Sequence, residues 1–329
     1  MLKRVYSFLL LSLFVLISNV SLAQYRLDYG VTFGPSNYVG DVGSGGDAKK
    51  LTKNLNRFGN VQWNETKYSI GAYGRYKFHP KVAGRLNFGV VRVEGDDKFA
   101  QSEGRRARNL NFKNNLIESS FIGEYYFYQS NDNSYRSRGV WRSGGRARKD
   151  FSAYAFTGVA GLYSNPKADY NGSLVKLQPL QTEGVKYGKF VFAIPVGIGV
   201  QYTINRQWKF GFELNYRHTF NDYLDDVSGV YKDPTTFTDP TAAALSNRRG
   251  ELTDENLPPA ENYGVRYNAT TKEYEPQKRG DPKQDDTFMT STFTVGYTLK
   301  GKNSFYKARY KYITSGKKRF KKRRGRAKF

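Results

Sequence analysis

Residues 208–218 read WKFGFELNYRH, and their alternation decides the fold. Every second side chain is large and apolar or aromatic, whereas the positions between are charged, polar or glycine. A period of two residues predicts a β-strand with two unlike faces. An apolar outer face over a polar or small inner face is typical of strands in membrane barrels. The two faces hold Trp208, Phe210, Phe212, Leu214 and Tyr216, and Lys209, Gly211, Glu213, Asn215 and Arg217.

The same period recurs in other segments of about ten residues, which is the length that a tilted strand needs to cross a bilayer. Two of them, 151–163 and 288–299, alternate less cleanly. The sequence therefore predicts an all-β chain that forms an eight-stranded antiparallel transmembrane β-barrel of the outer membrane, with long outer loops. The predicted strands are 25–33, 68–78, 82–91, 116–128, 151–163, 190–202, 208–218 and 288–299.

Composition agrees with a barrel, because the chain has 26 Tyr, 23 Phe and 33 Gly residues. A soluble β-sandwich would also alternate. The barrel is favoured because aromatic residues lie near the ends of the predicted strands, as membrane girdles require, and charges lie in mid-strand. Cysteine is absent, so no zinc–thiolate site and no nucleophilic thiol is available.

The inner face of the predicted strands is charged. A barrel of eight strands is too narrow for an open pore, and side chains fill it. Buried charges must be paired or hydrated. We expect a structural network of ion pairs that plugs the lumen, in preference to a path for protons or substrate. The inward charges are Arg26, Asp28, Arg75, Lys77, Arg85, Glu118, Glu124, Lys209, Glu213 and Arg217.

The first 23 residues have the layout of a secretory signal peptide. Lys3 and Arg4 precede an apolar stretch, and Ser21 and Ala23 are small residues three and one positions before Gln24, as expected for a cleavage site after residue 23. We therefore expect an exported mature chain, with the barrel in 24–300. We therefore expect no nucleic-acid partner, because an exported chain does not meet cytoplasmic nucleic acid.

Positive charge is concentrated in two segments. The chain has a net charge of +24, and 301–329 holds thirteen Lys or Arg residues and no acid. A second basic segment, 129–150, connects the fourth and fifth predicted strands. Concentrated charge favours a local contact with an anion. The predicted binding residues are Arg136, Arg138, Arg142, Arg146, Arg148 and Lys149, and Lys317, Lys318, Arg319, Lys321, Lys322, Arg323, Arg324 and Arg326.

The lengths of the connections orient the barrel. Short turns at 79–81 and 205–207 fall at one end, and the long connections, including 220–286, fall at the other, with 129–150 as the exception. Short turns normally face the periplasm. With an even number of strands, both termini lie on that side. The tail 301–329 and the segment 129–150 are then both periplasmic.

The periplasm offers three anionic surfaces: an acidic protein, the peptidoglycan and lipid headgroups. Phe305, Tyr310 and Phe320 are among the aromatic residues interleaved with cations in the tail. Aromatic residues and Arg are enriched in protein interfaces, which favours a protein partner. We expect the tail to be disordered when unbound and to order on binding. A tail that is simply solvated remains open.

No motif predicts catalysis, a cofactor or a metal. His79 lies in a short turn and His218 ends a strand, and neither is near a serine and an acid in a recognisable motif. The acidic pairs at 96–97, 225–226 and 285–286 lie at junctions of loops and strands. Calcium is conceivable there, but adjacent carboxylates lack the spaced ligands of a loop site. We expect solvated loop charges, no enzyme activity and no small-molecule substrate.

Three phrases resemble a known family: LDYGVTFGPSNYVGDVG at 27–43, RRARNLNFKNNLIE at 105–118 and GEYYF at 123–127. The chain resembles the PorG-type outer-membrane β-barrels of the Bacteroidetes type IX secretion system. This resemblance implies a non-enzymatic barrel that associates with a periplasmic ring of secretion proteins, one of them a lipoprotein. The tail does not match the family pattern, so its predicted role rests on charge and topology.

Two other functions remain open from the sequence. One is a barrel that stabilises the outer membrane or mediates surface adhesion through its outer loops. The other is a small-barrel enzyme acting on lipid, which would need a Ser/His/acid set at the membrane face.

Overall fold

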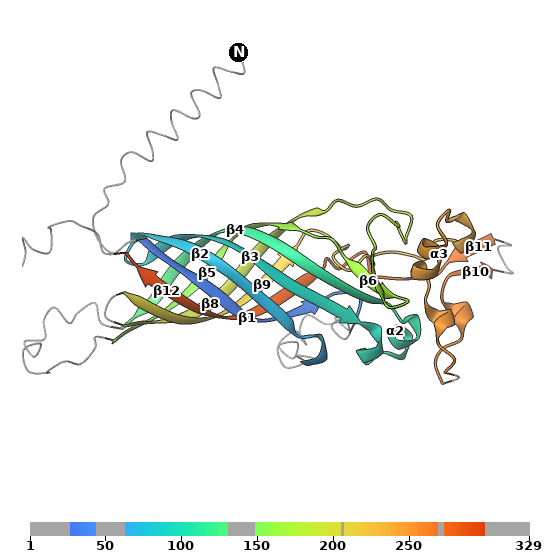
Figure 1. The fold of residues 1–329 in the computed structure, drawn as a ribbon, viewed down its shortest axis with the longest axis horizontal. Helices are drawn as coiled ribbons and strands as arrows, with labels where there is room; N and C mark the ends of the chain where they lie inside the picture. The colour runs from blue at the N-terminus through green and yellow to red at the C-terminus, as the bar shows by residue number, and fades with distance from the viewer. Residues whose placement is uncertain are drawn as a thin grey trace, which may run out of the picture.

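The computed structural model describes residues 27–43, 63–130, 149–204, 207–254, 256–268 and 273–299. Eight antiparallel strands form a closed barrel (Figure 1), which confirms the predicted fold class. All eight predicted strands are present. The barrel strands are β1 Leu27–Val39, β2 Lys67–His79, β3 Val82–Asp96, β4 Asn111–Gln129, β5 Lys149–Tyr163, β8 Phe190–Ile204, β9 Trp208–Thr219 and β12 Thr287–Thr298.

Neighbouring strands in the barrel are neighbours in the chain, apart from the pairing that closes it. The order runs β1, β2, β3, β4, β5, β8, β9 and β12, and β12 then pairs with β1. In that seam Asp28 lies opposite Thr298, and Val39 lies opposite Thr287. Closure leaves no barrel strand with an unpaired edge, which is what a lipid environment requires.

Strands β1, β3 and β4 extend well beyond their predicted ends, and in β3 and β4 the apolar face changes sides there. Leu86 and Phe88 of β3 face outward and are exposed, whereas Val91 and Val93 face inward and are buried. Outward positions beyond this point are polar, as at Arg92. The inward face of β4 likewise becomes apolar toward its beginning. The inversion marks where the barrel leaves the membrane, and the predicted strands end there because the expected pattern has its apolar residues on the outer face only.

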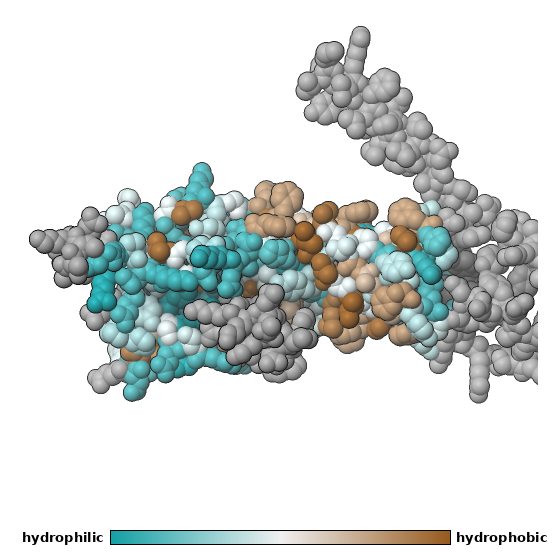
Figure 2. Space-filling model, turned by 180° about the vertical axis from the view of Figure 1, so that it is seen from behind, coloured by the Kyte–Doolittle hydropathy of each residue, from teal (hydrophilic) through white to brown (hydrophobic). Residues whose placement is uncertain are grey.

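A band of exposed apolar side chains surrounds the barrel. Figure 2 shows hydrophobic residues gathered around the strands, with hydrophilic residues covering the end that carries the long connections. Phe190 and Phe192 of β8 are 80% and 75% exposed. Such a surface is stable against lipid and unstable in water. Other members of the band include Tyr29, Val31, Phe33, Ile70, Phe78, Leu86, Phe88, Phe121, Phe127, Val159, Ile198, Trp208 and Phe293.

The long connections carry additional structure at one end of the barrel (Figure 1). The β6–β7 hairpin extends β4 outward, through the pairing of Lys113 with Lys167. Among the described residues, no helix is both long enough and apolar enough to span a membrane. The further elements are η2 Trp63–Glu65, η3 Asp97–Phe99, α2 Glu103–Arg108, β6 Lys167–Tyr170, β7 Ser173–Lys176, η5 Pro234–Thr236, α3 Pro240–Ser246, η6 Arg249–Glu251, η7 Ala260–Asn262, β10 Val265–Asn268 and β11 Glu273–Pro276.

Local sequence explains where the two α-helices end or begin. Helix α3 starts with Pro240 directly after Asp239, whose carboxylate accepts a hydrogen bond from the Thr241 amide at 2.8 Å. This is a favourable N-terminal cap followed by a residue with a preset φ. Helix α2 ends at Asn109, which adopts the left-handed conformation with φ of 57°. Asn tolerates that conformation better than most residues do.

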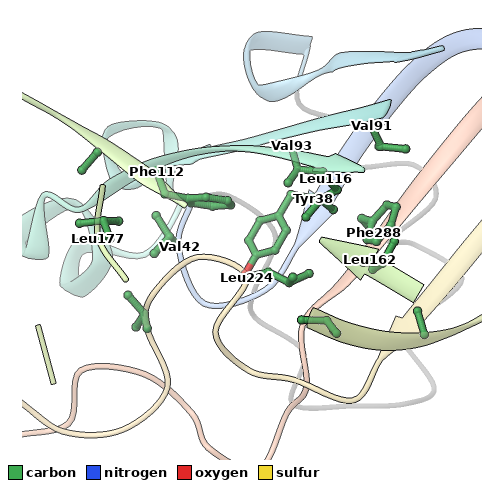
Figure 3. Close-up of a cluster of buried hydrophobic side chains, with 14 of the residues drawn as sticks. Tyr38, Val42, Val91, Val93, Phe112, Leu116, Leu162, Leu177, Leu224 and Phe288 are labelled. Carbon is green, nitrogen blue, oxygen red and sulfur yellow. The ribbon is translucent and has the colours of Figure 1, made fainter. Parts of the chain in front are cut away.

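An apolar core fills the mouth of the barrel below these connections (Figure 3). Phe112 and Leu116 of β4 and Phe288 of β12 supply its walls. Leu224 and Val227, from the connection after β9, enter it and are fully buried. Phe112 also packs edge-on against Tyr38, with ring centroids 4.7 Å apart. The mouth is therefore closed by packed side chains.

Candidate functional site

Ion pairs fill the lumen in the part of the barrel that the apolar band surrounds. The Arg85 guanidinium donates to Glu213 through Nη2 at 3.0 Å, and its Nε lies 3.1 Å from Glu124. Arg75 Nε lies 2.9 Å from Glu124 and its Nη1 donates to Gln201 at 2.6 Å. All of these side chains are buried. Two arginines and two carboxylates thus form one connected cluster.

Tyrosine hydroxyls complete the coordination of both carboxylates. Tyr154 donates to Glu213 at 2.6 Å, and Tyr126 donates to Glu124 at 2.8 Å. A buried charge is costly unless hydrogen bonds satisfy it, so these tyrosines stabilise the ionised cluster. The sequence reading missed both tyrosines. Their inward positions on β4 and β5 could have been found, because large inward aromatic residues explain why 151–163 alternates poorly.

A second ion pair lies in the lumen near the start of β1, where β1 pairs with the end of β12. Lys209 donates to Asp28, and Thr298 donates to the other oxygen of Asp28 at 2.8 Å. The Lys77 ammonium lies 4.1 Å from the centre of the Tyr126 ring. Cations are attracted to the face of an aromatic ring at this range. The structure therefore brings together the inward charges of β1, β2, β3, β4 and β9.

The remaining inward pair borders a cavity. Arg217 Nε lies 2.7 Å from Glu118, and Arg217 also donates to Thr290 at 2.7 Å. The cavity has a volume of about 40 Å³ and lies between this pair and the Arg85 cluster. The buried side-chain oxygens of Asn87 and Asn215 accept no hydrogen bond from a described residue. A polar cavity of this size is large enough to hold water.

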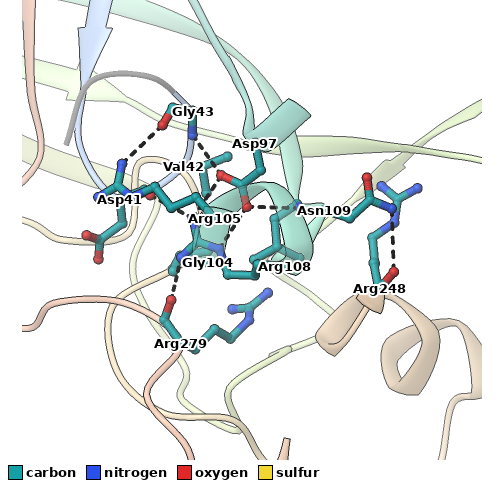
Figure 4. A network of polar contacts seen from close by, with 12 residues as sticks. Asp41, Val42, Gly43, Asp97, Gly104, Arg105, Arg108, Asn109, Arg248 and Arg279 are labelled. Atoms are coloured by element: carbon teal, nitrogen blue, oxygen red, sulfur yellow. Dashed lines mark hydrogen bonds and ion pairs between the residues drawn. The ribbon is translucent and has the colours of Figure 1, made fainter. Parts of the chain in front are cut away.

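Charged side chains also fix the outer connections to one another (Figure 4). Arg108 donates to both oxygens of Asp97, at 2.8 and 2.9 Å, and to the Asp41 carbonyl at 2.7 Å. Arg279 donates to Glu183 at 3.0 Å and to the Asp226 carbonyl at 2.8 Å. Both arginines are buried. These connections therefore form a folded cap, which the sequence reading did not predict.

The expectation that the acidic pairs are solvated is wrong for four of the six residues. Asp97, Asp225, Asp226 and Asp286 are at most 1% exposed. They are buried because they accept hydrogen bonds from the cap. Asp225 accepts from the Val42 and Val227 amides, each at 2.9 Å. No cluster of acidic or histidine side chains suited to a metal ion is present in the described part of the chain.

Tyr38 joins two of these carboxyl groups. Its hydroxyl lies 2.7 Å from Asp225 and is also in contact with Asp286. A hydroxyl has one proton to donate, so one of the two contacts needs a proton on a carboxyl group. Burial, together with the nearby Asp41 carboxylate, raises the pKa of Asp225 to about 7. Burial and the Asp225 charge also raise the pKa of Asp286.

Two neighbouring carboxyl groups also have raised pKa values. Burial raises the pKa of Asp226 to about 6 and that of Asp222 to about 8. Asp226 accepts hydrogen bonds from Thr182 and from Tyr187, each at 2.5 Å. The base of the cap therefore holds several carboxyl groups that titrate near neutral pH.

The predicted basic surface falls mainly outside the described residues. This applies to the five arginines between 136 and 148, to all of the predicted tail residues and to Arg26. Lys149 is the first residue of β5, where its backbone pairs with Ile204. Strand β4 ends and strand β5 begins at the barrel end opposite the cap (Figure 1), and their terminal residues there are Gln129 and Lys149.

Neither histidine lies in an assembled catalytic site among the described residues. His218 Nε2 lies 3.6 Å from Asp285, and both side chains are 43% exposed. No hydroxyl group of the described chain donates a hydrogen bond to this imidazole. His79 Nδ1 accepts a hydrogen bond from the Lys81 amide at 3.2 Å within the turn.

A model of a protein family described as "Domain of unknown function (DUF6089)" matches residues 3–238. No curated protein matches the chain significantly. Similar solved structures include the N-terminal β-barrel domain of Pseudomonas aeruginosa OprF, at 11% identity and a TM-score of 0.31, covering 83% of this chain and 98% of that one. OprG from the same organism has 10% identity and a TM-score of 0.34, covering 85% and 99%. Ail of Yersinia pestis has 10% identity and a TM-score of 0.31, covering 83% and 99%.

Proposed function

This chain belongs to the DUF6089 family, and we propose that it is a non-enzymatic outer-membrane barrel that docks a periplasmic protein-secretion assembly. The docking surface is the basic segment 129–150 together with the tail 301–329. The resemblance to PorG-type barrels suggests that the assembly is of the type IX kind, with a periplasmic ring that includes a lipoprotein.

The observation that carries this proposal is the double closure of the lumen. Buried ion pairs around Arg85 and Glu213 fill the membrane level, and the apolar core around Leu224 fills the mouth. A lumen filled at two levels leaves no continuous path for a solute. Since transport through the lumen is ruled out, the function is expected at the ends of the barrel.

Charge indicates which end of the barrel binds the partner. The end opposite the cap carries the strand ends at Gln129 and Lys149 and the beginning of β1. The short turns β2–β3 and β8–β9 lie at the same end, and short turns normally face the periplasm. The thirteen Lys and Arg residues of 301–329 follow the last strand at this end. An acidic periplasmic protein is the partner that complements them.

The test compares the full chain with a deletion of 301–329 and with a variant in which the tail cations are replaced by Gln. Both are purified from detergent extracts of cells that need the barrel for secretion. We expect the periplasmic partner to be lost from both variants while the barrel remains in the membrane. A third variant has the residues of 301–329 in scrambled order. It keeps the charge of the tail and changes its sequence, so it distinguishes binding by charge from binding by sequence. Unchanged partner yield and normal secretion in both variants would reject the proposal.

One observation favours a second function. The cap is a folded surface, fixed by buried arginines such as Arg108 and Arg279, and its surface is hydrophilic (Figure 2). A folded cap suits surface adhesion or stabilisation of the membrane. Retained partner binding with lost adhesion after disruption of Arg108 would favour this function. Release of fatty acid from lipid by the purified barrel would instead favour a lipid-modifying enzyme.

A further inference from the structure

Three lysines lie side by side where the β6–β7 hairpin extends β4. Lys113 of β4 is paired with Lys167 of β6, which is paired with Lys176 of β7. Side chains of directly paired residues lie on the same face of a sheet. Neighbouring strands are about 4.8 Å apart, so three ammonium groups are spread over about 10 Å.

This arrangement is unfavourable without an anion. Like charges directly opposite each other destabilise a sheet. Lys113 is neutralised by Asp169, at 2.5 Å. Lys167 and Lys176 make no ion pair with a described residue, and the Lys176 side chain is exposed. Two adjacent cations thus remain without a counter-charge in the described part of the protein.

The row lies on the outward face of the barrel, just beyond the apolar band. Ile117 of β4 is exposed within the band, and Lys113 follows it on the same face four residues nearer the cap. Four residues span about 13 Å along a strand, and less along the membrane normal because barrel strands are tilted. This is the depth at which lipid headgroups lie.

Further cations continue the row at this level. Lys67 lies 2.9 Å from Glu94, and Arg92 lies 2.5 Å from the other oxygen of the same carboxylate. Glu94 is directly opposite Lys113. We call these five cations the basic rim. Two carboxylates, Glu94 and Asp169, pair with its members, so the rim keeps a net positive charge. The basic rim comprises Lys67, Arg92, Lys113, Lys167 and Lys176.

We infer that the basic rim binds the phosphate groups of a multiply phosphorylated glycolipid in the outer leaflet. Three features support a lipid ligand of this class. The rim is continuous with the surface that contacts acyl chains, it carries a net positive charge, and its row of lysines is long enough for more than one phosphate. The leaflet follows from the orientation proposed above, which has its own test by labelling. The rim is at the end opposite the basic tail, so this inference is independent of docking.

The test uses the full chain in zwitterionic micelles at physiological ionic strength, titrated with lipid A and followed by native mass spectrometry. Lys167→Gln with Lys176→Gln should weaken lipid A binding about thirtyfold, because each lysine near an anionic surface contributes about a factor of five. Lys278→Gln with Lys283→Gln removes two cations from the same end outside the rim and should change nothing. Equal affinities for the rim variant and the unaltered chain would overturn the inference.

A single reversal separates ligand binding from a structural role. Lys176→Glu places an acid opposite Lys167, so it should raise the urea midpoint of unfolding without lipid A and still weaken lipid A binding. A loss of stability together with a loss of binding would indicate a structural role and overturn the inference. Phosphatidylglycerol carries one phosphate and should bind the unaltered rim at least tenfold more weakly than lipid A. Equal binding would overturn the assignment to a multiply phosphorylated glycolipid.

Discussion

Arg85 of β3 and Glu213 of β9 meet across the lumen from opposite sides of the barrel, although 128 residues separate them in the chain. Each strand lies four positions from the other around the barrel, in either direction. Their pair therefore braces the wall across its full width. Both side chains are buried, so the pair is protected from the screening that weakens surface ion pairs.

Replacing Glu213 with Leu should lower the free energy of unfolding by about 3–5 kcal/mol. The change leaves Arg85 without two of its hydrogen bonds, and breaking a buried pair on one side costs about that much. Urea unfolding of the refolded barrel in micelles measures it. Glu103→Leu is the matched control, because the Glu103 side chain is 70% exposed on α2. Stability equal to that of the control would contradict the bracing role of the pair.

Replacing Leu224 with Ala should destabilise the mouth core by about 2–5 kcal/mol, the range for truncating a buried leucine. Leu224 is fully buried there, and its amide also donates to Asp286 at 2.9 Å. The same unfolding measurement applies. Leu174→Ala on the exposed face of β7 serves as the control and should cost less than about 0.5 kcal/mol. A cost as small as this at Leu224 would mean that the mouth is not tightly packed.

The base of the cap should loosen as pH rises. Asp225, with a pKa near 7, keeps a proton that the unfolded chain loses near pH 4. A raised carboxyl pKa gives full stability below pH 4, and that stability declines up to the folded pKa. Asp222, with a pKa near 8, extends the decline. Besides burial, the Asp41 charge raises the pKa of both groups, the Tyr38 hydroxyl lowers that of Asp225, and the Asp225 and Asp285 charges raise that of Asp222.

Hydrogen exchange of the amides of 224–227, corrected for the intrinsic effect of pH, measures this loosening. Between pH 5 and pH 8, the opening equilibrium should increase by up to about tenfold for each unit over which one proton is released. Asp225→Asn should flatten the dependence while preserving most of the hydrogen bonds. A protection that rises with pH would reverse the sign and show that these carboxyl groups are ionised throughout.

Cysteine labelling in whole cells tests the orientation. Thr253→Cys lies on the exposed surface of the cap and should react with an impermeant maleimide in intact cells. Lys317→Cys should react only after the outer membrane is permeabilised. Leu162→Cys, buried in the mouth core, should stay unlabelled in both conditions. Labelling of position 317 in intact cells, with no labelling of position 253, would reverse the orientation.

Alternation alone was sufficient to predict the barrel, because lipid outside and a narrow lumen inside impose opposite demands on neighbouring residues. Parity also assigned Arg75, Arg85 and Glu213 to the inner face, where the structure has them. It could not assign partners. Arg85 meets Glu213 because of how the barrel closes, and closure is a property of the whole sheet.

The cap could not be predicted from the sequence, for a different reason. Asp225 looks like any loop carboxylate in the sequence, and its burial depends on amides and on Tyr38 from segments far away in the chain. Arg108 likewise donates to Asp97 and to the carbonyl of Asp41. Contacts of this kind leave no periodic signal, so charge in a loop was read as exposure to solvent.

The seam between β1 and β12 makes the barrel sensitive to its own completeness. Asp28 is paired with Thr298, so the first and last strands must both be present before the ring can close. A chain that stops before β12 has two unpaired edges, which a bilayer does not tolerate. It also lacks Thr298, one of the donors that satisfy Asp28 in the lumen. Membrane insertion therefore selects against truncated chains, since a chain without β12 has no stable state in the membrane.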